Sequence, residues 1–457
     1  MNAIDLFCGA GGFSTGFEQA GINVQYGIDI NEVALDSFRT NHSGSGILHD
    51  ISEGIPEEIS DLDIDVVFGS PPCKGFSDAR GSRRLDDERN QLVFSFIQWV
   101  DHLQPKYLMM ENVAGMTTIS DEFLQAIEKE YREAGYVVNH NTLNAANFGV
   151  PQTRKRVIYF GVREDRDIEP SLPEGNYRKN VDGQMTLSGD EIQSWVTVSE
   201  AVEDLPAPTK NGEVDLPPVS EYPHNDYLTL IRNGAEKTSN HIAKEPSDDE
   251  ITQHIVEELD PGEMYRSSRF GERYRQVWDL LSNQFSEIEK SALQFIAKHR
   301  SKKDFRMSGK SVGAVPDHLI VEHLKYNDDK IYTALTSLHG RGWIRTDEKG
   351  DILGYDLNTK SGIRPRYMRL SPDGQSNTIL TTDFNPRDKL HPIKNRGLSL
   401  REGARIQSFP DSFRFLGSFN NIAEQIGNAV PPLMAKHLAE HLIKDSKQDD
   451  SISSAAK

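Results

Sequence analysis

The first 162 residues alternate short apolar runs with segments of helical periodicity. Apolar runs of this length indicate parallel strands that are buried on both faces of a sheet. The predicted strands are Ala3–Phe7, Val24–Ile30, Asp65–Gly69, Tyr107–Glu111 and Val157–Val162. Helical patterns lie between them, for example over Asn90–His102 and Ser120–Ala134. This alternation predicts an α/β fold built on a doubly wound, mostly parallel sheet.

The alternation ends at about residue 163, where Pro, Gly and acidic residues become frequent. Residues 164–193 are predicted to form a loop-rich linker, and Trp195–Leu205 a short ordered element before a mostly irregular stretch to residue 250. Three helices and a hairpin are then expected at Ser286–His299, Asp317–Tyr326, Asp328–His339 and 343–357. This is the order of a winged helix, but a helical insertion without a DNA role fits it equally well.

Two more helices are predicted near the C-terminus, at Leu400–Gln407 and Asn428–Ile443. The last helix is expected to return to the sheet of the N-terminal part, and the polar residues after it to be frayed. The predicted division is therefore 1–165 with 422–445 as the sheet domain, 166–421 as a second, smaller region that carries an insertion at 262–362, and 446–457 as a disordered tail.

The composition is that of a soluble, globular chain of two or three domains, with 457 residues, 36% hydrophobic and 26% charged. No apolar run is long enough to span a membrane, and the N-terminus lacks the pattern of a signal peptide. Only two cysteines, Cys8 and Cys73, are present, which indicates a reducing cytoplasm rather than a disulfide framework. No metal is expected: His437 and His441 share a helix face but have no third ligand.

The net charge of −19 taken alone argues against a nucleic-acid partner, because phosphate binding needs Lys and Arg. Net charge describes the whole molecule, however, and a basic cleft can lie on an acidic body. Arginines do cluster locally, at 80–84 and at 154–156. Arg401 and Arg405, on a predicted helix, are expected either to contact phosphates or to be ordinary surface charge.

Cys73 is the most informative residue of the chain. An apolar strand leads into Ser70-Pro71-Pro72-Cys73, so the thiol follows a turn that two prolines stiffen. A thiol on a stiff loop at the end of a strand is placed for nucleophilic attack rather than for packing. Cys8, next to glycines, is expected to be a small packing residue.

A glycine-rich turn follows the first strand, in Asp5-Leu6-Phe7-Cys8-Gly9-Ala10-Gly11-Gly12. Glycines there allow a tight turn and a close approach to a ligand. Asp29 ends the second strand, where a carboxylate typically bonds ribose hydroxyls. Asp50 follows the next segment and could bond an exocyclic amine. Together they predict a nucleoside-type cofactor site with Phe7 and Ile30 as apolar walls, although core packing explains these two equally well.

Glu111 and a pair of arginines complete the predicted chemistry. Glu111 ends a buried strand next to the strand that leads to Cys73, and a carboxylate buried there without a role would be costly. Arg154 and Arg156 are alternate residues of a predicted strand and are therefore expected to share one face. Two guanidinium groups on one face suit a phosphate or a bound base.

Six segments, in this order and spacing, resemble those of the DNA (cytosine-5)-methyltransferase family of bacterial and archaeal type. They are Asp5–Gly12, Gly69–Ser77, Glu111–Val113, Gln152–Arg156, Leu400–Pro410 and Gln425–Pro432. The resemblance covers roughly 1–206 and 365–442, and it says little about 207–364. It implies a Rossmann-like methyltransferase sheet, a target-recognition role for 166–421, S-adenosylmethionine as cofactor and cytosine in DNA as substrate.

The resemblance also implies a role for each matching residue. Cys73 would add to C6 of a cytosine flipped out of the duplex, Glu111 would hold N3 and the 4-amino group, and Arg154 and Arg156 would hold the O2 side. The positions that match cofactor contacts are Phe7, Gly9, Gly11, Gly12, Asp29, Ile30, Asp50, Ile51, Pro71, Leu92, Asn428 and Ala429. The positions expected to contact DNA are Ser77, Arg80, Arg83, Arg84 and Gln152.

One residue departs from the family pattern: Lys74 stands where the family usually has Gln. A cation beside Cys73 would favour the thiolate. It puts the contacts of this loop with the flipped base in doubt, but not the chemistry.

Two other functions share part of this pattern. The relatives that methylate tRNA usually lack a long variable region, whereas more than 200 residues separate Val162 from Leu400. A catalytically silent DNA-binding regulator would not need Cys73, Glu111 and the arginine pair. The expected partners are double-stranded DNA and a cognate restriction endonuclease or defence-system proteins, with no membrane. The protein is expected to be a cytoplasmic monomer, associated with the nucleoid through DNA.

Overall fold

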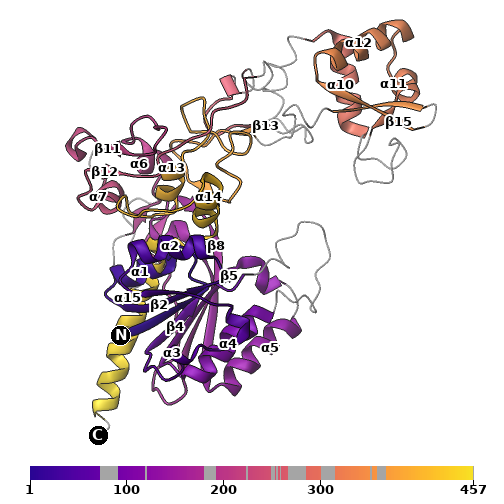
Figure 1. The fold of residues 1–457 in the computed structure, drawn as a ribbon. Helices are drawn as coiled ribbons and strands as arrows, with labels where there is room; N and C mark the ends of the chain where they lie inside the picture. The colour runs from indigo at the N-terminus through magenta and orange to yellow at the C-terminus, as the bar shows by residue number, and fades with distance from the viewer. Residues whose placement is uncertain are drawn as a thin grey trace. The chain divides into compact units, whose positions relative to one another are not determined.

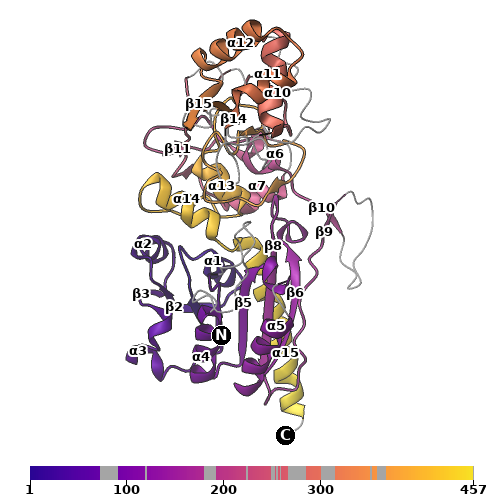
Figure 2. The same cartoon turned by 90° about the vertical axis from the view of Figure 1, so that its right-hand side faces the viewer.

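The structure is a computed structural model of the whole chain. The residues that it describes are 1–72, 91–118, 121–179, 192–222, 225–248, 253, 256–257, 259–265, 285–299, 314–349, 352–357 and 367–455. The chain forms two compact units (Figures 1 and 2). The first comprises Met1–Ala243, Pro372–Thr382 and Ser399–Lys457, and the second comprises Lys244–Ser371 and Asp383–Leu398. This division differs from the predicted one, because residues 166–243, 372–382 and 399–421 belong to the same unit as the sheet.

The first unit is built on a seven-stranded sheet in the order β3-β2-β1-β4-β5-β8-β6 (Figure 1). Its strands are β1 (Asn2–Leu6), β2 (Asn23–Asp29), β3 (Ser45–Leu48), β4 (Val66–Gly69), β5 (Tyr107–Val113), β6 (Tyr136–Asn144) and β8 (Lys155–Arg163). All are parallel except β8, which runs antiparallel to both β5 and β6. The mostly parallel α/β sheet is therefore confirmed, whereas the prediction of a parallel strand at Val157–Val162 is wrong in direction.

Helices cover both faces of this sheet. They are α1 (Gly12–Gln19), α2 (Glu32–Asn41), α3 (Glu57–Ser60), α4 (Gln91–Leu103), α5 (Asp121–Glu133) and α15 (Pro432–Ala455), with short 3-10 turns at Ile51–Glu53, Ala114–Thr118 and Ala145–Phe148. Alternate residues of a strand point to opposite faces. Ile4 and Leu6 of β1 pack into the core that α4 and α5 close. On the other face, Phe68 of β4 contacts Phe13 and Phe17 of α1.

The last helix extends further than predicted. We expected disorder from residue 446, but α15 continues to Ala455. Asp449 on this helix is buried and accepts hydrogen bonds of 3.1 Å from the Tyr107 hydroxyl and from Arg166. These contacts could not be predicted from the polar composition of the segment, because the partners of Asp449 lie far away in the sequence.

Replacing Asp449 with alanine should therefore destabilise the first unit. The change removes the hydrogen bonds that Asp449 accepts from the buried Tyr107 hydroxyl and from Arg166, and the loss of such buried bonds typically costs about 1–3 kcal/mol. Urea unfolding followed by circular dichroism measures the loss. Lys447→Ala, an exposed change on the same helix, is the control and should shift the unfolding free energy by less than about 0.5 kcal/mol. Equal stabilities of the two variants would show that α15 is not anchored at Asp449.

The rest of the first unit consists of short elements. They are α6 (Val198–Val202), α7 (Asp226–Arg232), α13 (Leu400–Ile406), α14 (Phe419–Asn428), a 3-10 turn at Val219–Glu221, and the two-residue strands β7 (Gln152–Thr153), β9 (Tyr177–Arg178), β10 (Gln193–Ser194), β11 (Val214–Asp215), β12 (Lys237–Thr238) and β18 (Ser376–Asn377). Capping boxes begin α6 at Thr197 and α13 at Ser399. The helix at α13 was predicted as such, whereas the segment of α6 was predicted only as a short ordered element, and its capping box was a local signal for a helix.

Arg401 and Arg405 of α13 are completely buried, so both predictions for them are wrong. The Arg401 guanidinium donates to the backbone carbonyls of Ser239, Pro410 and Phe413. Arg405 instead forms ion pairs with Asp204 and Asp411, which are also buried. These two arginines therefore hold the first unit together and offer no charge to a phosphate.

The second unit contains the predicted three helices and hairpin. Its elements are α10 (Glu287–His299), β14 (Val315–Pro316), α11 (Asp317–His323), α12 (Asp328–Gly340), β15 (Ile344–Lys349) and β16 (Ile352–Leu357), with β13 (Met264–Tyr265) pairing with β17 (Tyr367–Met368) elsewhere in the unit. The unpredicted β14 joins the hairpin in a sheet of order β14-β16-β15. A DNA role for this insertion stays a prediction. Among the described helices, none is long and apolar enough to cross a membrane.

Candidate active site

The predicted functional residues follow strands of the sheet that run in the same direction. β2, β1, β4 and β5 are parallel neighbours, so their carboxyl ends meet at one edge of the sheet. Asp29 ends β2, Phe7 follows β1, Pro71 follows β4 and Glu111 lies near the end of β5. Open α/β sheets bind their ligands at this edge.

The glycine-rich turn after β1 is held by Asp29. Phe7, Gly9 and Gly11 have positive φ values of 60°, 54° and 94°, which turn the chain sharply between β1 and α1. The Asp29 carboxylate accepts hydrogen bonds of 2.8 Å from the backbone N–H groups of Gly9 and Asn31. Burial raises the pKa of Asp29. Each carboxylate oxygen keeps a second lone pair, so a ligand hydroxyl can still bond there.

The surroundings of Asp29 fit a nucleoside. Ile30, the next residue, exposes 70% of its surface, and Leu48 of the neighbouring strand exposes 53%. No heavy atom lies within 4 Å of the position that a Cβ on Gly9 would take. Exposed apolar side chains beside a fixed carboxylate and an open glycine suit a ribose and a flat base. Ile30 is therefore not a core residue, whereas Phe7 is partly buried against the core.

The structure places the other predicted cofactor residues in different environments. Asp50 caps a 3-10 turn, and hydrogen bonds from Ser52 hold its pKa below the usual range. The Ile51 side chain is buried in the core, and its carbonyl accepts a 3.0 Å bond from the Trp99 indole. Leu92 lies half-buried in the first turn of α4. Asp50 thus presents a carboxylate, while Ile51 could contribute only its backbone.

The segment that follows α14, at Ala429 and Val430, packs against the glycine-rich turn. A Cβ on Gly12 would lie 2.6 Å from the carbonyl oxygen of Val430 and 3.1 Å from Cβ of Ala429. Only glycine fits such a close approach. Asn428 is the exposed last residue of α14, directly before this contact. The structure therefore brings together two predicted cofactor segments from opposite ends of the chain.

Two residues of this edge were missed in the sequence. Asp5 is buried beneath the glycine-rich turn and accepts a 2.5 Å hydrogen bond from the Ser14 hydroxyl, and burial raises its pKa well above the usual value. Asn112 is also buried, and its side-chain amide donates to the Pro71 carbonyl at 3.1 Å. Asp5 lies just before the glycines of the turn, Gly9 to Gly12, and Asn112 directly follows Glu111. These neighbouring motifs could have indicated both residues.

Glu111 forms an ion pair with Arg156. Arg156 Nε lies 2.7 Å from Glu111 Oε1, and the two side chains expose only 14% and 9% of their surface. The antiparallel pairing of β5 with β8 creates this contact, because it sets Arg156 opposite Val113. A buried carboxylate that is fixed by one guanidinium can still accept a hydrogen bond from an amino group of a ligand.

Arg154 has a separate environment. It is buried and donates to the backbone carbonyls of Ile379 at 3.3 Å and Gly427 at 3.1 Å. Burial, and then repulsion from Arg156, lowers the pKa of Arg154 to about 9, although Glu111 acts in the opposite direction. Its guanidinium therefore joins three distant segments of the chain, while Arg156 alone pairs with Glu111.

Gln152 was predicted to contact DNA, and the structure corrects this. Its side chain has no exposed surface, donates to the Ile406 carbonyl at 2.9 Å and to Gln407, and accepts from the Ile379 backbone N–H at 3.1 Å. An amide whose donors and acceptor are used inside the protein cannot reach a nucleic acid.

The predicted nucleophile and most predicted DNA contacts lie outside the described residues. These are Cys73, Lys74, Ser77, Arg80, Arg83 and Arg84, together with the rest of the loop to Arg89. The described chain stops at Pro72, directly before Cys73, and resumes at Gln91. The bond from Asn112 to Pro71 therefore fixes the last described turn before the thiol.

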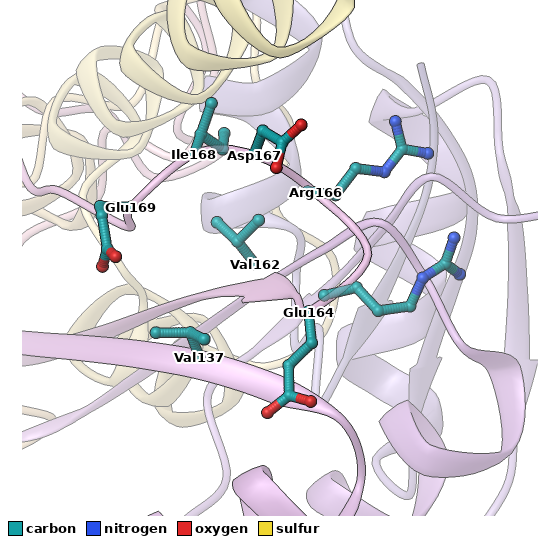
Figure 3. Close-up of a pocket in the computed structure, with 8 residues that line it drawn as sticks. Val137, Val162, Glu164, Arg166, Asp167, Ile168 and Glu169 are labelled. Carbon is teal, nitrogen blue, oxygen red and sulfur yellow. The ribbon is translucent and has the colours of Figure 1, made fainter. Parts of the chain in front are cut away.

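An open pocket of about 510 Å³ lies elsewhere, at the opposite edge of the sheet (Figure 3). It is lined by Val137, Val162, Arg163, Glu164, Arg166, Asp167, Ile168 and Glu169. Its arginines already form ion pairs, Arg163 with Asp165 and Arg166 with Asp449. The pocket contains none of the predicted site residues. Within the described ranges, no group of three metal-ligating side chains is found.

The glycine-rich turn can be tested through Gly11. A Cβ on Gly11 would lie 2.1 Å from Nε2 of the buried His42, and φ is already positive, so Gly11→Ala should destabilise the protein by more than about 1 kcal/mol. Gly9→Ala is the control, since its φ is also positive but the space beside it is empty. Thermal unfolding without ligand measures both. The packing of His42 against Gly11 is contradicted if Gly9→Ala is the more destabilised variant.

Comparisons with known proteins agree with this geometry. A family model described as C-5 cytosine-specific DNA methylase matches residues 1–444. The type II methyltransferase M.AgeI of Thalassovita gelatinovora is 32% identical over 96% of this chain and 98% of its own length. M.DdeI of Desulfomicrobium norvegicum is 30% identical over 97% of this chain and 88% of its own.

A solved structure shares the fold. It is an E. coli prophage-encoded protein assigned as a DNA modification methyltransferase, with a TM-score of 0.62 and 21% identity. The alignment covers 98% of this chain and 99% of that one. At this identity the likeness concerns the architecture.

Proposed function

The chain belongs to the C-5 cytosine-specific DNA methylase family and methylates cytosine in DNA at C5, and we propose that it does so with Cys73 as the nucleophile and with Glu111 and Arg156 holding the base. The observation that carries this proposal is the buried Glu111–Arg156 pair at 2.7 Å. It lies at the edge of the sheet where the glycine-rich turn and Asp29 form a site that fits a nucleoside.

S-adenosylmethionine is the proposed cofactor, and it supplies the methyl group. Asp29 would hold the ribose of this cofactor, and Ile30 would contact its base. The open space beside Gly9 would let the cofactor lie close to the protein backbone. Asp50 would accept from the exocyclic amine. The exposed Ile30 and the empty space beside Gly9 support this assignment, because neither is explained by packing within the protein.

The reaction needs a covalent step, because C5 of cytosine is a weak nucleophile. The Cys73 thiolate would form a bond from Sγ to C6 of a flipped-out cytosine, which makes C5 enamine-like. C5 then takes the methyl group, a base removes the C5 proton, and the Sγ–C6 bond breaks to restore the aromatic ring. Lys74, next in the chain, and nearby arginines would favour the thiolate.

Glu111 and Arg156 would act on the base rather than on the methyl group. Glu111 can accept a hydrogen bond from the 4-amino group, and a proton held between its carboxyl group and N3 would neutralise the negative charge that reaches N3 when Sγ adds to C6. Arg156 would then contact O2 while it keeps Glu111 in place. Arg154 is a positioning residue in this proposal, because its guanidinium bonds two backbone carbonyls and a base would have to reach it in a buried position.

Glu111→Gln should reduce kcat for DNA methylation by about 10²-fold, since an amide cannot carry the charge or share the proton at N3. A filter assay with labelled S-adenosylmethionine measures this rate. Glu289→Gln is a matched control, because Glu289 is also a buried carboxylate paired with an arginine, Arg341, at 3.2 Å. If both variants lose activity equally, the loss reports damage to the fold and the role of Glu111 is not supported.

The substrate is tested by giving the purified protein labelled cofactor with plasmid DNA, with bulk tRNA or with both. Transfer to plasmid DNA alone is expected. Transfer to tRNA alone would overturn the proposed substrate, and no transfer to either, with intact cofactor binding, would favour a silent regulator.

We further propose that this is the modification enzyme of a type II restriction system, as the names of its relatives indicate for those proteins. A cognate endonuclease would then cleave the sequence that this enzyme protects. Cloned DNA from cells that express the protein would show methylation at one short sequence. Scattered methylation without a common sequence would contradict this part of the proposal.

A further inference from the structure

A short loop in the second unit presents an isoleucine to solvent. Ile393 exposes 65% of its surface, and it lies at the tip of the loop His391–Gly397. A single exposed apolar residue is ordinary in itself. This loop differs from an ordinary surface loop, because buried hydrogen bonds of Arg369 and His391 fix its shape.

Arg369 fills the inside of the loop. It is 3% exposed, and Nη1 donates to the carbonyls of His391 at 2.9 Å and Lys394 at 2.8 Å. Nη2 donates to Asn395 Oδ1 at 2.7 Å and to the Val256 carbonyl at 2.6 Å, and Nε donates to the Leu259 carbonyl at 2.7 Å. All five N–H groups of the guanidinium are therefore used.

His391 fixes the tip itself. Its Nδ1 accepts hydrogen bonds of 3.1 Å from the backbone N–H groups of both Ile393 and Lys394. A bridge between Leu390 and Gly397 closes the base of the loop. Because both sides and the centre are bonded, the loop does not need to be ordered when it binds a partner.

The charged residues around the tip of the loop indicate which kind of partner it would bind. Lys394, next to Ile393, is exposed, and so is Arg387. Lys389 and Asp383 form a buried ion pair at 2.6 Å and so contribute no net charge. Arg396 adds a further positive charge and Asp388 a negative one, so the stretch 383–397 has four basic and two acidic residues, a net charge of +2 on a chain whose net charge is −19, which is complementary to a polyanion.

We propose that the loop His391–Gly397 is a preformed contact to the duplex, with Ile393 against apolar base or sugar surface in a groove and Lys394 on a phosphate. This inference rests on the proposed function and adds to it a binding element in the second unit. Apolar side chains recognise the thymine methyl group or the sugar face, and lysine neutralises a phosphate. A rigid loop that offers both matches the requirements of a DNA contact.

The test uses the full-length protein and a duplex that the wild type methylates. Ile393→Ala should weaken binding of this duplex about tenfold, with the salt dependence unchanged, because only apolar contact is lost. Val137→Ala is the matched control, since Val137 is also exposed, by 43%, but lies on β6 of the first unit. Its affinity should equal that of the wild type.

Lys394→Gln should instead reduce the slope of log affinity against log salt by about 0.9, the value for one lost phosphate contact. Lys447→Gln, an exposed lysine of α15 in the first unit, should leave this slope unchanged. Cofactor affinity and thermal unfolding should be the same in all four variants, which separates DNA contact from damage to the fold.

Methylation by the wild type in the same samples reports on the proposed function separately. If the wild type methylates the duplex but Ile393→Ala and Lys394→Gln bind it as the wild type does, the loop proposal is overturned and the enzyme assignment stands. If the wild type does not methylate any duplex, the assignment itself fails.

Discussion

Cys73→Ala is expected to abolish methylation of DNA, with a loss on the order of 10⁴-fold or more, because the covalent intermediate cannot form without its nucleophile. Binding of the duplex and of S-adenosylmethionine should remain, since the thiol contributes to neither in the proposed mechanism. Scintillation counting of labelled DNA measures the first effect, and fluorescence titration measures the other two.

The other cysteine of the chain provides the control. Cys8 is buried beside the glycine-rich turn, and burial raises the pKa of its thiol well above the usual value, so it is not a thiolate at neutral pH. Cys8→Ala should therefore keep activity within about tenfold of the wild type, as expected for a packing change. Activity that survives Cys73→Ala but not Cys8→Ala would exchange the roles of the two thiols and refute the mechanism.

Much of the sheet edge could be predicted because its signals are local. A strand that ends in Asp29, a glycine-rich turn after Leu6 and a carboxylate in Glu111-Asn112-Val113 are each visible within a few residues. Parallel strands bring such ends to one edge, so the residues meet without further information. The direction of β8 was not predictable in this way, because a buried apolar run looks the same in both directions.

The environments of the polar side chains were much harder to predict. The side-chain amide of Gln152 forms its hydrogen bonds with Ile406, Gln407 and Ile379, and each of these contacts spans more than 200 residues of sequence. A hydrogen-bond partner that lies so far away in the sequence cannot be identified from the residues around Gln152. The same reason explains why Asp449 was assigned to a disordered tail.

Arg405→Met is expected to destabilise the first unit by about 3–5 kcal/mol, the cost of leaving the buried Asp411 carboxylate without its arginine, while Asp204 keeps its ion pair with Arg232 at 2.9 Å. Arg405 Nε and Nη2 donate to Asp411 at 2.9 and 2.7 Å, whereas Nη1 and Nη2 donate to Asp204, and all three side chains are completely buried. Although burial alone would lower the pKa of Arg405, the ion pairs with Asp411 and Asp204 raise it above its usual range. Urea unfolding of the two proteins measures the difference.

A second arginine of α13 separates charge from hydrogen bonding. Arg401 is as deeply buried, but it bonds only neutral carbonyls, and burial lowers its pKa to about 10. Arg401→Met leaves no stranded charge, so its loss should be smaller, about 1–3 kcal/mol. A loss of stability that is equal in Arg405→Met and Arg401→Met would contradict the ion-pair account.

The central claim is that Cys73 forms a bond to C6 of cytosine in DNA, and trapping that bond tests it most directly. Amplified DNA in which 5-fluorocytosine replaces cytosine contains the target sequence whatever it is, and fluorine at C5 leaves no proton to be removed, so Sγ cannot depart. After incubation with S-adenosylmethionine and proteolysis, mass spectrometry should find one peptide, containing Cys73, that carries a methylated fluorocytosine. An adduct on Cys8, or efficient methylation of ordinary DNA with no adduct on any cysteine, would contradict the account.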